Sequence, residues 1–257
     1  MERIPLTAFS PLIRLLAGKR VFVARPPGNV GDKLIYFGTL QLFTRLGVEL
    51  CDENKPAQLY CYAGGGNLGS AYMHLCQPVW DRLRHLAKKH AGKIVVLPQS
   101  WYDDPSRPSP RPWSVPDAEA VFAREEVTYN NMPGSVLVPD LALLTNIDWK
   151  LPSVEQSVGL WLRRDREGLF ASSAQAKDSC GDPALRALDA RSYINLAAKY
   201  AHVITDRLHF AIAAMLAGRR ATLLPGNYHK NQAMWQTWLH DLGCEWAETP
   251  EEALRRR

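Results

Sequence analysis

The segment 205–209, Thr-Asp-Arg-Leu-His, combines within five residues the groups that can bind an anion and move a proton. The guanidinium of Arg207 can hold a carboxylate or a phosphate through two parallel hydrogen bonds. His209 can share that anion or donate a proton, because imidazole titrates near neutral pH. We expect Thr205 or Asp206 to cap a following helix, whose dipole favours an anion. The competing interpretation is structural, with Asp206 paired to Arg207 and His209 packed.

Two glycine-rich segments, 28–32 (Gly-Asn-Val-Gly-Asp) and 64–67 (Gly-Gly-Gly-Asn), can bring backbone N–H groups close to a ligand. Each is expected to lie between a strand and a helix N-terminus, which adds partial positive charge. A tight turn without a ligand is the alternative for both. Neither segment has the pattern of a P-loop or of a dinucleotide fingerprint. The ligand-binding candidates in them are Asn29, Asp32, Gly66 and Asn67.

Three further charged positions follow predicted strands. Arg163 and Arg164 are adjacent, and because neighbouring residues on a strand point to opposite faces, only one of them is expected to reach a ligand. A single lysine is usually a solvated surface residue, and this is the alternative for Lys230. Asp140 follows a strand in the pair Pro-Asp. Together with segment 205–209, these positions predict an anion site.

The elements that must position these residues are short apolar runs, each followed by a turn and a helical stretch, which is typical of a parallel sheet wrapped by helices. The motifs all lie just past a predicted strand, and in open α/β sheets the carboxyl ends of the strands are where ligands bind. The predicted strands are 21–24, 48–50, 58–62, 93–97, 120–123, 135–138, 158–162, 202–204 and 220–224.

We expect an α/β protein with two domains, because a polar, proline-containing stretch at 146–157 separates two series of strands and helices. The predicted domains are residues 1–150 and 151–257, both Rossmann-like and facing one another across a cleft. A proline-rich stretch, 104–116, cannot be regular helix or central strand and is either a surface connection or a lid.

Composition narrows the class of partner. The net charge of +5 favours anionic partners, and no basic run is interleaved with aromatic residues, so nucleic acid is not expected. The five cysteines form neither a CxxC pair nor a cluster at zinc spacing, so no metal is expected. The scattered cysteines, the lack of a signal peptide and the lack of an apolar run of roughly 18 to 20 residues predict a cytoplasmic protein.

In the order of these motifs, the sequence resembles the polysaccharide pyruvyltransferase family over about 21–243. The resemblance implies a two-domain fold like that of GT-B glycosyltransferases, with an acceptor-side first domain and a donor-side second domain. It implies transfer of a pyruvyl group from phosphoenolpyruvate to a sugar, as a cyclic ketal, with no cofactor beyond this co-substrate. The motifs that carry it are 28–32, 64–67, Pro98-Gln99-Ser100, Arg124-Glu125, Pro139-Asp140, Arg163, 205–209 and Lys230.

The resemblance also implies roles for these residues. The Arg-Leu-His triplet, Arg207, Leu208 and His209, corresponds to the family's donor-binding and catalytic triplet. We expect His209 to be the general acid that protonates C3 of the enol. The expected anion ligands are Arg207, Arg163 and Lys230, and the expected base is Asp32 or Asp140.

The short chain and its proline insert are similar to exopolysaccharide enzymes of the xanthan type, which implies a polyprenyl-linked oligosaccharide acceptor. The enzyme would then work at the inner membrane surface, where segments 6–20 and 255–257 could bind anionic headgroups. An amphipathic surface helix and a solvated tail are the alternative for these segments. Two other functions stay open: a nucleotide-sugar-dependent GT-B glycosyltransferase and a non-catalytic glycan-binding protein.

Overall fold

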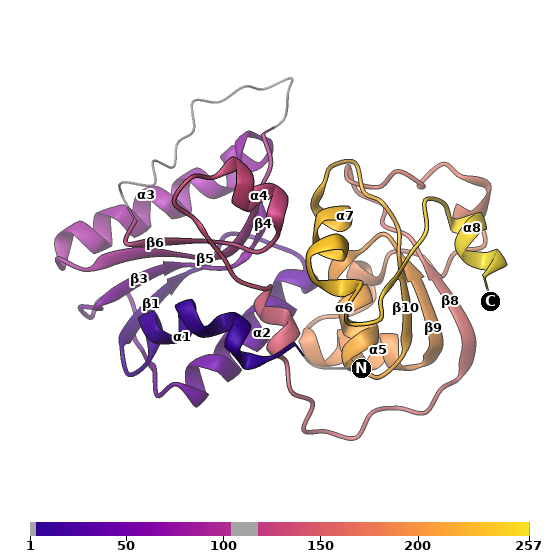
Figure 1. Cartoon of the computed structure of the whole chain (residues 1–257), viewed down its shortest axis with the longest axis horizontal. Helices are drawn as coiled ribbons and strands as arrows, with labels where there is room; N and C mark the ends of the chain where they lie inside the picture. Colours follow the sequence, from indigo (N-terminus) through magenta and orange to yellow (C-terminus); the bar gives the residue numbers. More distant parts are fainter. Residues whose placement is uncertain (1–3, 104–117, 257) are drawn as a thin grey trace. The chain divides into compact units, whose positions relative to one another are not determined.

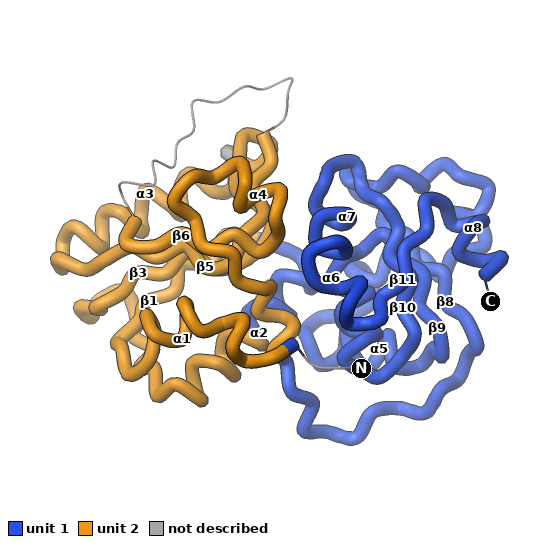
Figure 2. The backbone as a smooth tube through the Cα atoms, viewed as in Figure 1, with its two compact units in different colours: residues 1–4, 28–37, 145–257 blue, residues 5–27, 38–144 orange. Residues whose placement is uncertain are grey.

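The computed structural model describes residues 4–103 and 118–256. By its internal contacts the chain divides into two compact units (Figure 2). Unit 1 consists of residues 1–4, 28–37 and 145–257, and unit 2 of residues 5–27 and 38–144. The proline-rich stretch predicted to be a connection or a lid lies outside the described residues.

Unit 2 is built on a sheet of seven parallel strands (Figure 1). The strand order is β2-β1-β3-β5-β6-β7, with β4 paired to β5 beyond this path. The strands β3 and β5 at its centre are buried along nearly their whole length, as expected for a parallel sheet covered on both faces. The strands are β1 Arg20–Ala24, β2 Glu49–Leu50, β3 Leu59–Tyr62, β4 Gly65–Leu68, β5 Lys93–Trp101, β6 Ala120–Ala123 and β7 Val136–Leu137.

Three helices belong wholly to unit 2: α1 Ser10–Leu16, α3 Met73–Lys89 and α4 Glu126–Asn131. The inner face of α3 carries Trp80 and Leu83 into the main core cluster, where they pack with Tyr62 and Val96 of the sheet. The helix α4 begins at a cap, because the Glu125 side chain accepts a hydrogen bond from the Thr128 N–H.

Unit 1 is built on four parallel strands in the order β11-β10-β9-β8. Its central helix α6 carries the sequence LHFAIAAML, which is buried at seven of its nine positions and therefore forms the core of the unit. The strands are β8 Gln156–Trp161, β9 Tyr200–Thr205, β10 Arg220–Leu223 and β11 Glu245–Trp246, and the helices are α5 Ala190–Ala198, α6 Leu208–Leu216, α7 Lys230–Met234 and α8 Pro250–Arg255.

The helix α2, Val30–Arg45, is divided between the two units. Its first part, within residues 28–37, makes its contacts with unit 1, whereas its remainder belongs to unit 2. A side-chain contact shows the attachment to unit 1: Lys33 Nζ donates to the Leu188 carbonyl at 2.7 Å. The predicted boundary after residue 150 stays a prediction.

Two motifs predicted to be loops after strands are strands themselves. Segment 64–67 largely forms β4, with Gly65 opposite Gln99 of β5. Pro98-Gln99-Ser100 lies inside β5, which continues to Trp101. A proline cannot donate to the ladder, but the pairing of β5 with β6 shifts register between Val96 and Gln99, so the missing N–H falls at an irregular position.

The predicted α/β class with parallel strands and covering helices is confirmed. The GT-B-like arrangement of two facing domains stays a prediction. In residues 4–103 and 118–256, no helix combines the length and the apolar character that a membrane crossing requires.

Candidate functional site

The charged motifs of unit 1 follow the carboxyl ends of neighbouring strands. Arg163 comes two residues after the end of β8, and Asp206 comes directly after β9. Lys230 begins α7, which follows β10. Because the strands are parallel and adjacent, their carboxyl ends meet at one edge of the sheet. The side chains therefore gather at the edge where α/β proteins bind ligands.

The backbone between β9 and α6 is fixed by its own polar side chains. Thr205 Oγ1 accepts from the Arg207 N–H at 3.0 Å, and Asp206 Oδ1 accepts from the Arg163 N–H at 2.8 Å. The prediction that Thr205 or Asp206 caps the helix is therefore wrong. The helix begins only at Leu208, its N-cap position is Arg207, and no side chain caps it. The first N–H groups of α6 are consequently not occupied by a capping side chain.

Six side chains form a continuous series of ion pairs, which we call the charge chain. It runs in the order Asp182, Arg207, Asp165, Arg163, Glu167, Lys230. Arg207 binds Asp182 through Nε at 3.0 Å and Nη2 at 2.6 Å. Asp165 lies between the two arginines, 2.7 Å from each, and Glu167 Oε2 is shared by Arg163 at 2.6 Å and Lys230 at 2.7 Å. Three cations and three carboxylates thus balance one another.

The charge chain shifts the pKa values of four of its members, Arg163, Arg207, Asp165 and Asp182, toward the ionised forms. Burial alone would lower the pKa of Arg163, but Glu167 and Asp165 outweigh it and raise that pKa. Burial likewise opposes ionisation of Asp182, yet hydrogen bonds from Arg207 leave the pKa of Asp182 below its ordinary value. The shifts of Arg163, Arg207, Asp165 and Asp182 thus all favour the charged forms, and this edge of the sheet carries closely spaced opposite charges.

Asp206 has the opposite character. Burial raises its pKa to about 7, although the Arg163 N–H and the charges of Arg163 and Arg207 act to lower it. Its Oδ2 atom is buried and has no hydrogen-bond partner among the described residues. A carboxyl group that takes up its proton near neutral pH therefore lies directly beneath the two arginines.

His209 is the partly exposed polar residue of an otherwise buried helix. The ring of Phe210 behind it packs against Tyr193 at 5.0 Å and Trp161 at 5.5 Å between ring centroids, which fixes the start of α6. On the other side lies Gly31: a Cβ atom added there would stand 3.0 Å from both Cβ and Nδ1 of His209. The His209 imidazole therefore packs against the start of α2.

Segment 28–32 closes on itself at the start of α2. Asn29 Oδ1 accepts from the Gly31 N–H at 2.7 Å, and Asp32 Oδ2 accepts from the Asn29 N–H at 2.8 Å. This reciprocal pattern resembles a capping box and explains the residue types without a ligand. It also brings Asp32 into unit 1, the unit that holds His209. Of the two predicted bases, Asp32 shares a compact unit with the predicted acid.

Lys230 and Leu208 are held by buried contacts. Asn231, next to Lys230, donates from Nδ2 to the carbonyls of Asp206 at 2.8 Å and Leu224 at 2.9 Å, so α7 is tied to the ends of β9 and β10. Leu208, the first residue of α6, is buried, so its side chain packs in the core.

The remaining predicted residues belong to unit 2, and their approach to the charge chain stays a prediction. Gly66 and Asn67 lie in β4. Asp140 is fully buried and accepts from Arg124 Nη1 and from the Ala142 N–H, each at 2.8 Å. A sealed ion pair of this kind holds a loop in place, which is a structural explanation for the Pro-Asp motif.

Sequence reasoning missed four residues of the charge chain and its support: Asp165, Glu167, Asp182 and Asn231. Asp182 lies in a polar stretch that reads as loop, and it reaches Arg207 across 25 positions of sequence. The signal that was available is the clustering of acidic residues just after Arg163. It could have indicated that a buried arginine at a strand end needs a nearby carboxylate.

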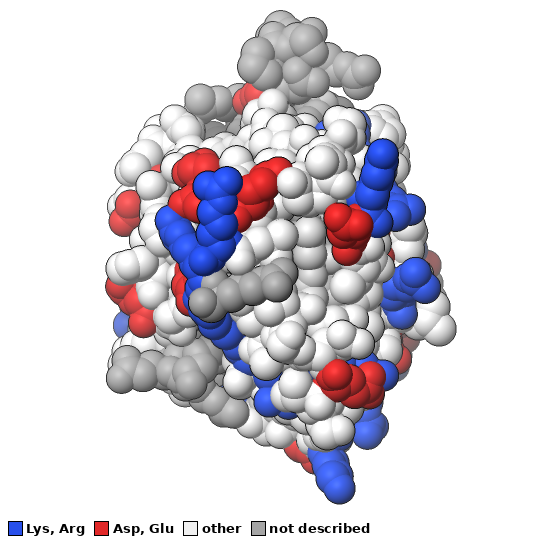
Figure 3. Space-filling model, turned by 90° about the vertical axis from the view of Figure 1, so that its right-hand side faces the viewer, with Lys and Arg blue, Asp and Glu red and all other residues white. Residues whose placement is uncertain are grey.

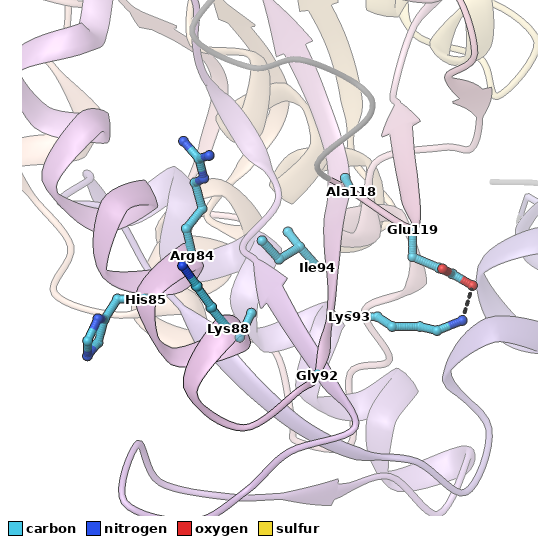
Figure 4. Close-up of a pocket in the computed structure, with 9 residues that line it drawn as sticks. Arg84, His85, Lys88, Gly92, Lys93, Ile94, Ala118 and Glu119 are labelled. Carbon is cyan, nitrogen blue, oxygen red and sulfur yellow. Dashed lines mark hydrogen bonds and ion pairs between the residues drawn. The ribbon is translucent and has the colours of Figure 1, made fainter.

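A hollow of about 480 Å³ in unit 2 is lined by basic residues but lies at the wrong end of its sheet (Figure 4). It borders the amino ends of β5 and β6, beside the last turns of α3. Lys93 is paired with Glu119 at 2.7 Å, and the side chains of Arg84 and His85 point away from that pair. Its cations therefore do not converge on one ligand position.

Surface charge does not single out a ligand face by itself. On the face of the molecule in Figure 3, basic and acidic side chains lie next to one another. The net charge of +5 is thus distributed, and anion binding has to come from local geometry. Within residues 4–103 and 118–256, no three His, Cys, Asp or Glu side chains are grouped so that they could hold a metal ion.

Comparison with known proteins identifies the family. A family model described as polysaccharide pyruvyl transferase matches residues 29–227, which include Asn29, His209 and every member of the charge chain except Lys230. The chain belongs to the polysaccharide pyruvyl transferase family. Membership makes it a transferase and indicates a pyruvyl-transfer role in polysaccharide biosynthesis. The resemblance inferred from the motifs is thereby confirmed at the level of the family, while the xanthan type stays a prediction.

Two individual proteins are similar over most of this family member's length. General stress protein 30 of Bacillus subtilis is 24% identical over 276 residues, covering 87% of this chain and 79% of that protein. The crystal structure of an uncharacterised protein from Klebsiella pneumoniae is 20% identical and covers 97% of this chain and 100% of that one, with a TM-score of 0.67. This likeness shows a shared fold. The iron-containing glycosyltransferase TibC of Escherichia coli is 10% identical over 81% of this chain and 58% of that one, and its TM-score of 0.33 carries no argument.

Proposed function

We propose that this family member transfers a pyruvyl group from phosphoenolpyruvate to two hydroxyls of a sugar in an exopolysaccharide repeat unit, forming a cyclic ketal. The observation that carries the proposal is the meeting, in one compact unit, of three cations, an uncapped helix N-terminus and a partly exposed histidine. Phosphoenolpyruvate has a carboxylate and a phosphate on one small carbon frame. Its recognition requires several cations close together.

In the proposed binding mode the two anionic groups of the donor take positions that side-chain carboxylates occupy in the structure. Asp165 lies between Arg163 and Arg207, and Glu167 lies between Arg163 and Lys230. Asp165 is 43% exposed and Glu167 is 12% exposed, whereas Asp182 is 3% exposed. We therefore infer that Asp165 and Glu167 give way to the donor, and that Asp182 remains in place and orients Arg207.

The proposed chemistry starts with a proton from His209 to C3 of the donor, which becomes a methyl group and leaves C2 electron-poor. One sugar hydroxyl then adds to C2 and gives its proton to a base, for which Asp32 is the stronger candidate and Asp140 the weaker. The second hydroxyl forms the other C–O bond as the bond from C2 to the phosphate oxygen breaks, and its proton passes to the departing phosphate. Phosphate leaves with the electron pair of that bond, and Arg163 and Lys230 stabilise its charge. Two C–O bonds form, one breaks, and no oxidant is needed.

The placement of the reaction is also part of the proposal. We infer a polyprenyl-linked oligosaccharide acceptor at the inner membrane surface, with segment 6–20 and the arginines at the C-terminus as the membrane-facing candidates. In the structure α1 buries Leu12 and Leu16 and carries Arg14 in its last turn, so it presents at most a basic edge. Vesicle sedimentation with anionic and with neutral lipids tests the proposed membrane association separately from the reaction.

The decisive experiment incubates the protein with phosphoenolpyruvate and a panel of mannose- and galactose-terminated acceptors. Phosphate release and the mass gain of the acceptor are both measured. We expect acceptor-dependent phosphate release together with the mass of one pyruvate ketal. Nucleotide-sugar donors in parallel reactions test the glycosyltransferase alternative. If none of the acceptors in the panel causes phosphate release, the proposal is overturned.

Two variants divide the roles. We expect His209→Gln to lower turnover by about 10² to 10⁴, the usual worth of a general acid, with little change in donor affinity. Arg207→Lys should instead weaken donor binding, because lysine cannot reproduce the bidentate guanidinium. Both variants should keep the parent's cooperative melting curve. If His209→Gln binds and turns over like the parent, another residue supplies the proton.

A further inference from the structure

A second hollow in unit 1 borders the charge chain at Arg163 and adds two further cations, Arg164 and Lys177. It has a volume of about 500 Å³ and is formed by the chain just after β8 and by the segment 171–179. The side chains that matter for its chemistry are those of Arg164, Lys177, Ser172, Ser173 and Ser179. A cavity of this size accommodates a small organic ligand.

The fold builds this hollow by holding segment 171–179 against the end of β8. The Cys180 N–H donates to the Leu160 carbonyl at 2.8 Å, and the Leu162 N–H donates to the Gly181 carbonyl at 3.1 Å. The Arg164 N–H donates to Asp182 Oδ2 at 3.0 Å, which fixes the chain just after β8. Arg163 and Arg164 both line the hollow, but the Arg163 guanidinium is paired with Asp165 and Glu167 of the charge chain.

Arg164 and Lys177, the two cations of this hollow that are not members of the charge chain, differ from those members in their partners. Each of Arg163, Arg207 and Lys230 is bound to at least one carboxylate. Within residues 4–103 and 118–256, the side chains of Arg164 and Lys177 have neither an ion pair nor a hydrogen bond. The hollow has no Asp or Glu among its lining residues. The charges of Arg164 and Lys177 are therefore not neutralised by a side chain of the described residues.

The serines supply hydroxyl groups beside these cations. Ser179 Oγ donates its one proton to the Ala176 carbonyl at 2.8 Å, so the donors left for a ligand are the hydroxyls of Ser172 and Ser173. Ser173 Oγ is buried and has no hydrogen-bond partner within the described parts of the chain. A buried hydroxyl without a partner is unfavourable unless a ligand or water completes it. Hydroxyls with an arginine and a lysine are the donor set that proteins use for phosphoryl oxygens.

From this combination of cavity, unpaired cations and hydroxyls, we infer that the hollow is a binding site for the phosphoryl group of a phosphate or diphosphate ester. The site adjoins the donor site at the charge chain, because Arg163 borders both, but Arg164 and Lys177 belong to the hollow alone, so the inference does not depend on the proposed function. Arg164 and Lys177 hold the phosphoryl oxygens, and Ser172 and Ser173 supply the neutral donors. The rest of the ligand covers the small side chains of Ala171 and Ala176, which line the same hollow.

The test titrates pyrophosphate into the full chain by calorimetry, with Arg164→Gln and Lys177→Gln as variants. Lys150→Gln is the matched control, because Lys150 is another exposed lysine of unit 1 without an ion pair in the described residues. We expect each test variant to weaken binding by roughly tenfold, equal to 1.4 kcal/mol, and the control to stay within about twofold. Failure of pyrophosphate to bind, or equal affinities in all four proteins, would overturn the inference.

A competition arm separates this site from the charge chain. Saturating phosphoenolpyruvate should leave the pyrophosphate affinity nearly unchanged, and Arg207→Lys should keep it. If phosphoenolpyruvate displaces pyrophosphate and the test variants have no effect, the ion lies on the charge chain and the inference is wrong. If phosphoenolpyruvate does not react but pyrophosphate binding still depends on Arg164, the inference stands and the proposed function fails.

Two further probes identify the source of the phosphoryl group. Glucose 1-phosphate represents a soluble ester, and phosphatidylcholine vesicles containing a few per cent of polyprenyl diphosphate represent a lipid-linked one. Binding of either that is lost in Arg164→Gln supports the site and names its source. Vesicles of pure phosphatidylcholine are the control for adsorption.

Discussion

Two arginine–carboxylate arrangements follow strand ends in this protein, and they differ in how they are closed. In unit 2, Arg124 and Asp140 are both fully buried, 2.8 Å apart, and Arg124 Nε also donates to Ser100 at 2.8 Å. In unit 1, the charge chain extends over three strand ends and becomes more exposed from Asp182 to Asp165. Both arrangements begin with the same kind of motif, a charged residue just after a strand.

The difference shows what distinguishes a structural ion pair from a ligand site. A sealed pair has already lost its hydration, so its partners are fixed and no ligand can exchange with them. In the charge chain the exposure increases from Asp182 to Asp165. In the proposed binding mode Asp182 stays in place, whereas the carboxylates of Asp165 and Glu167 are exchanged for the anionic groups of a ligand. An exchangeable carboxylate between two cations marks a position that a ligand anion can take.

The largest expected effect is on the sealed pair. Arg124→Ala leaves the Asp140 carboxylate buried without its cation, so we expect a loss of about 3–5 kcal/mol in the free energy of unfolding. Asp165→Asn, at a half-exposed position of the charge chain, should change stability by about 1 kcal/mol or less. Urea denaturation of the two variants and the parent measures both. A small effect of Arg124→Ala, comparable to that of Asp165→Asn, would remove the distinction.

The next prediction concerns the contact between α2 and the proposed acid. Gly31→Ala places a methyl group 3.0 Å from Cβ and Nδ1 of His209, so the imidazole must shift by a few tenths of an ångström. We expect turnover to fall by roughly tenfold to a hundredfold, because catalysis is sensitive to small displacements. Gly226→Ala is the matched control, since its nearest neighbour would be 3.7 Å away. Equal turnover in both variants would show that the position of His209 does not limit the reaction.

A smaller effect is expected where the charge chain is exchangeable. Glu167→Gln removes the carboxylate shared by Arg163 and Lys230, so an incoming anion no longer competes with it. We expect phosphoenolpyruvate to bind about threefold to tenfold more tightly, about 1 kcal/mol, measured by calorimetry. Arg220 is paired with Glu245 at the opposite, amino end of β10, and Glu245→Gln is therefore the control. Weaker binding in Glu167→Gln would mean that Glu167 positions the cations instead of competing with the ligand.

Much of the fold was predictable because apolar strands of four to six residues alternate with helices. The strand 202–204 and the buried helix after it are found where expected, since VIT and FAIAAML leave little choice of environment. The strand nature of Gly65 to Leu68 was not predictable, because it depends on pairing with the far end of β5. Glycine has low strand propensity, and only that tertiary contact overrides it.

The site was predictable in its cations but not in its carboxylates. A buried Arg207 at the start of a helix requires an anion, but sequence does not say whether a ligand or Asp182 supplies it. The capping role expected of Asp206 failed for a related reason: its side chain is taken by the Arg163 N–H, 43 positions away. Contacts at that separation depend on strand order, which motif spacing does not give.

The smallest expected effect tests whether the carboxyl group beneath the arginines carries a proton. In the folded protein the pKa of Asp206 is raised to about 7 by burial, from the ordinary 3.8, so the folded state binds a proton that the unfolded state has released. Its contribution to stability is fully present below about pH 4 and is lost as the pH rises through about 7. Between pH 6 and 8 we expect the parent's free energy of unfolding to fall by an amount on the order of 1 kcal/mol through this group alone.

Asp206→Asn should remove that part of the slope, because the amide does not titrate. Melting curves of parent and variant at intervals between pH 6 and 8 measure the difference, in which the contributions of the histidines cancel. Asp189→Asn serves as the control: Asp189 caps α5 and its pKa is lowered, chiefly by hydrogen bonds from Ser192, so it titrates in acid and leaves this window unchanged. Parallel profiles for Asp206→Asn and the parent would show that Arg163 and Arg207 keep Asp206 ionised. The charge chain would then rest on a fixed negative charge, closer in character to the sealed pair of unit 2.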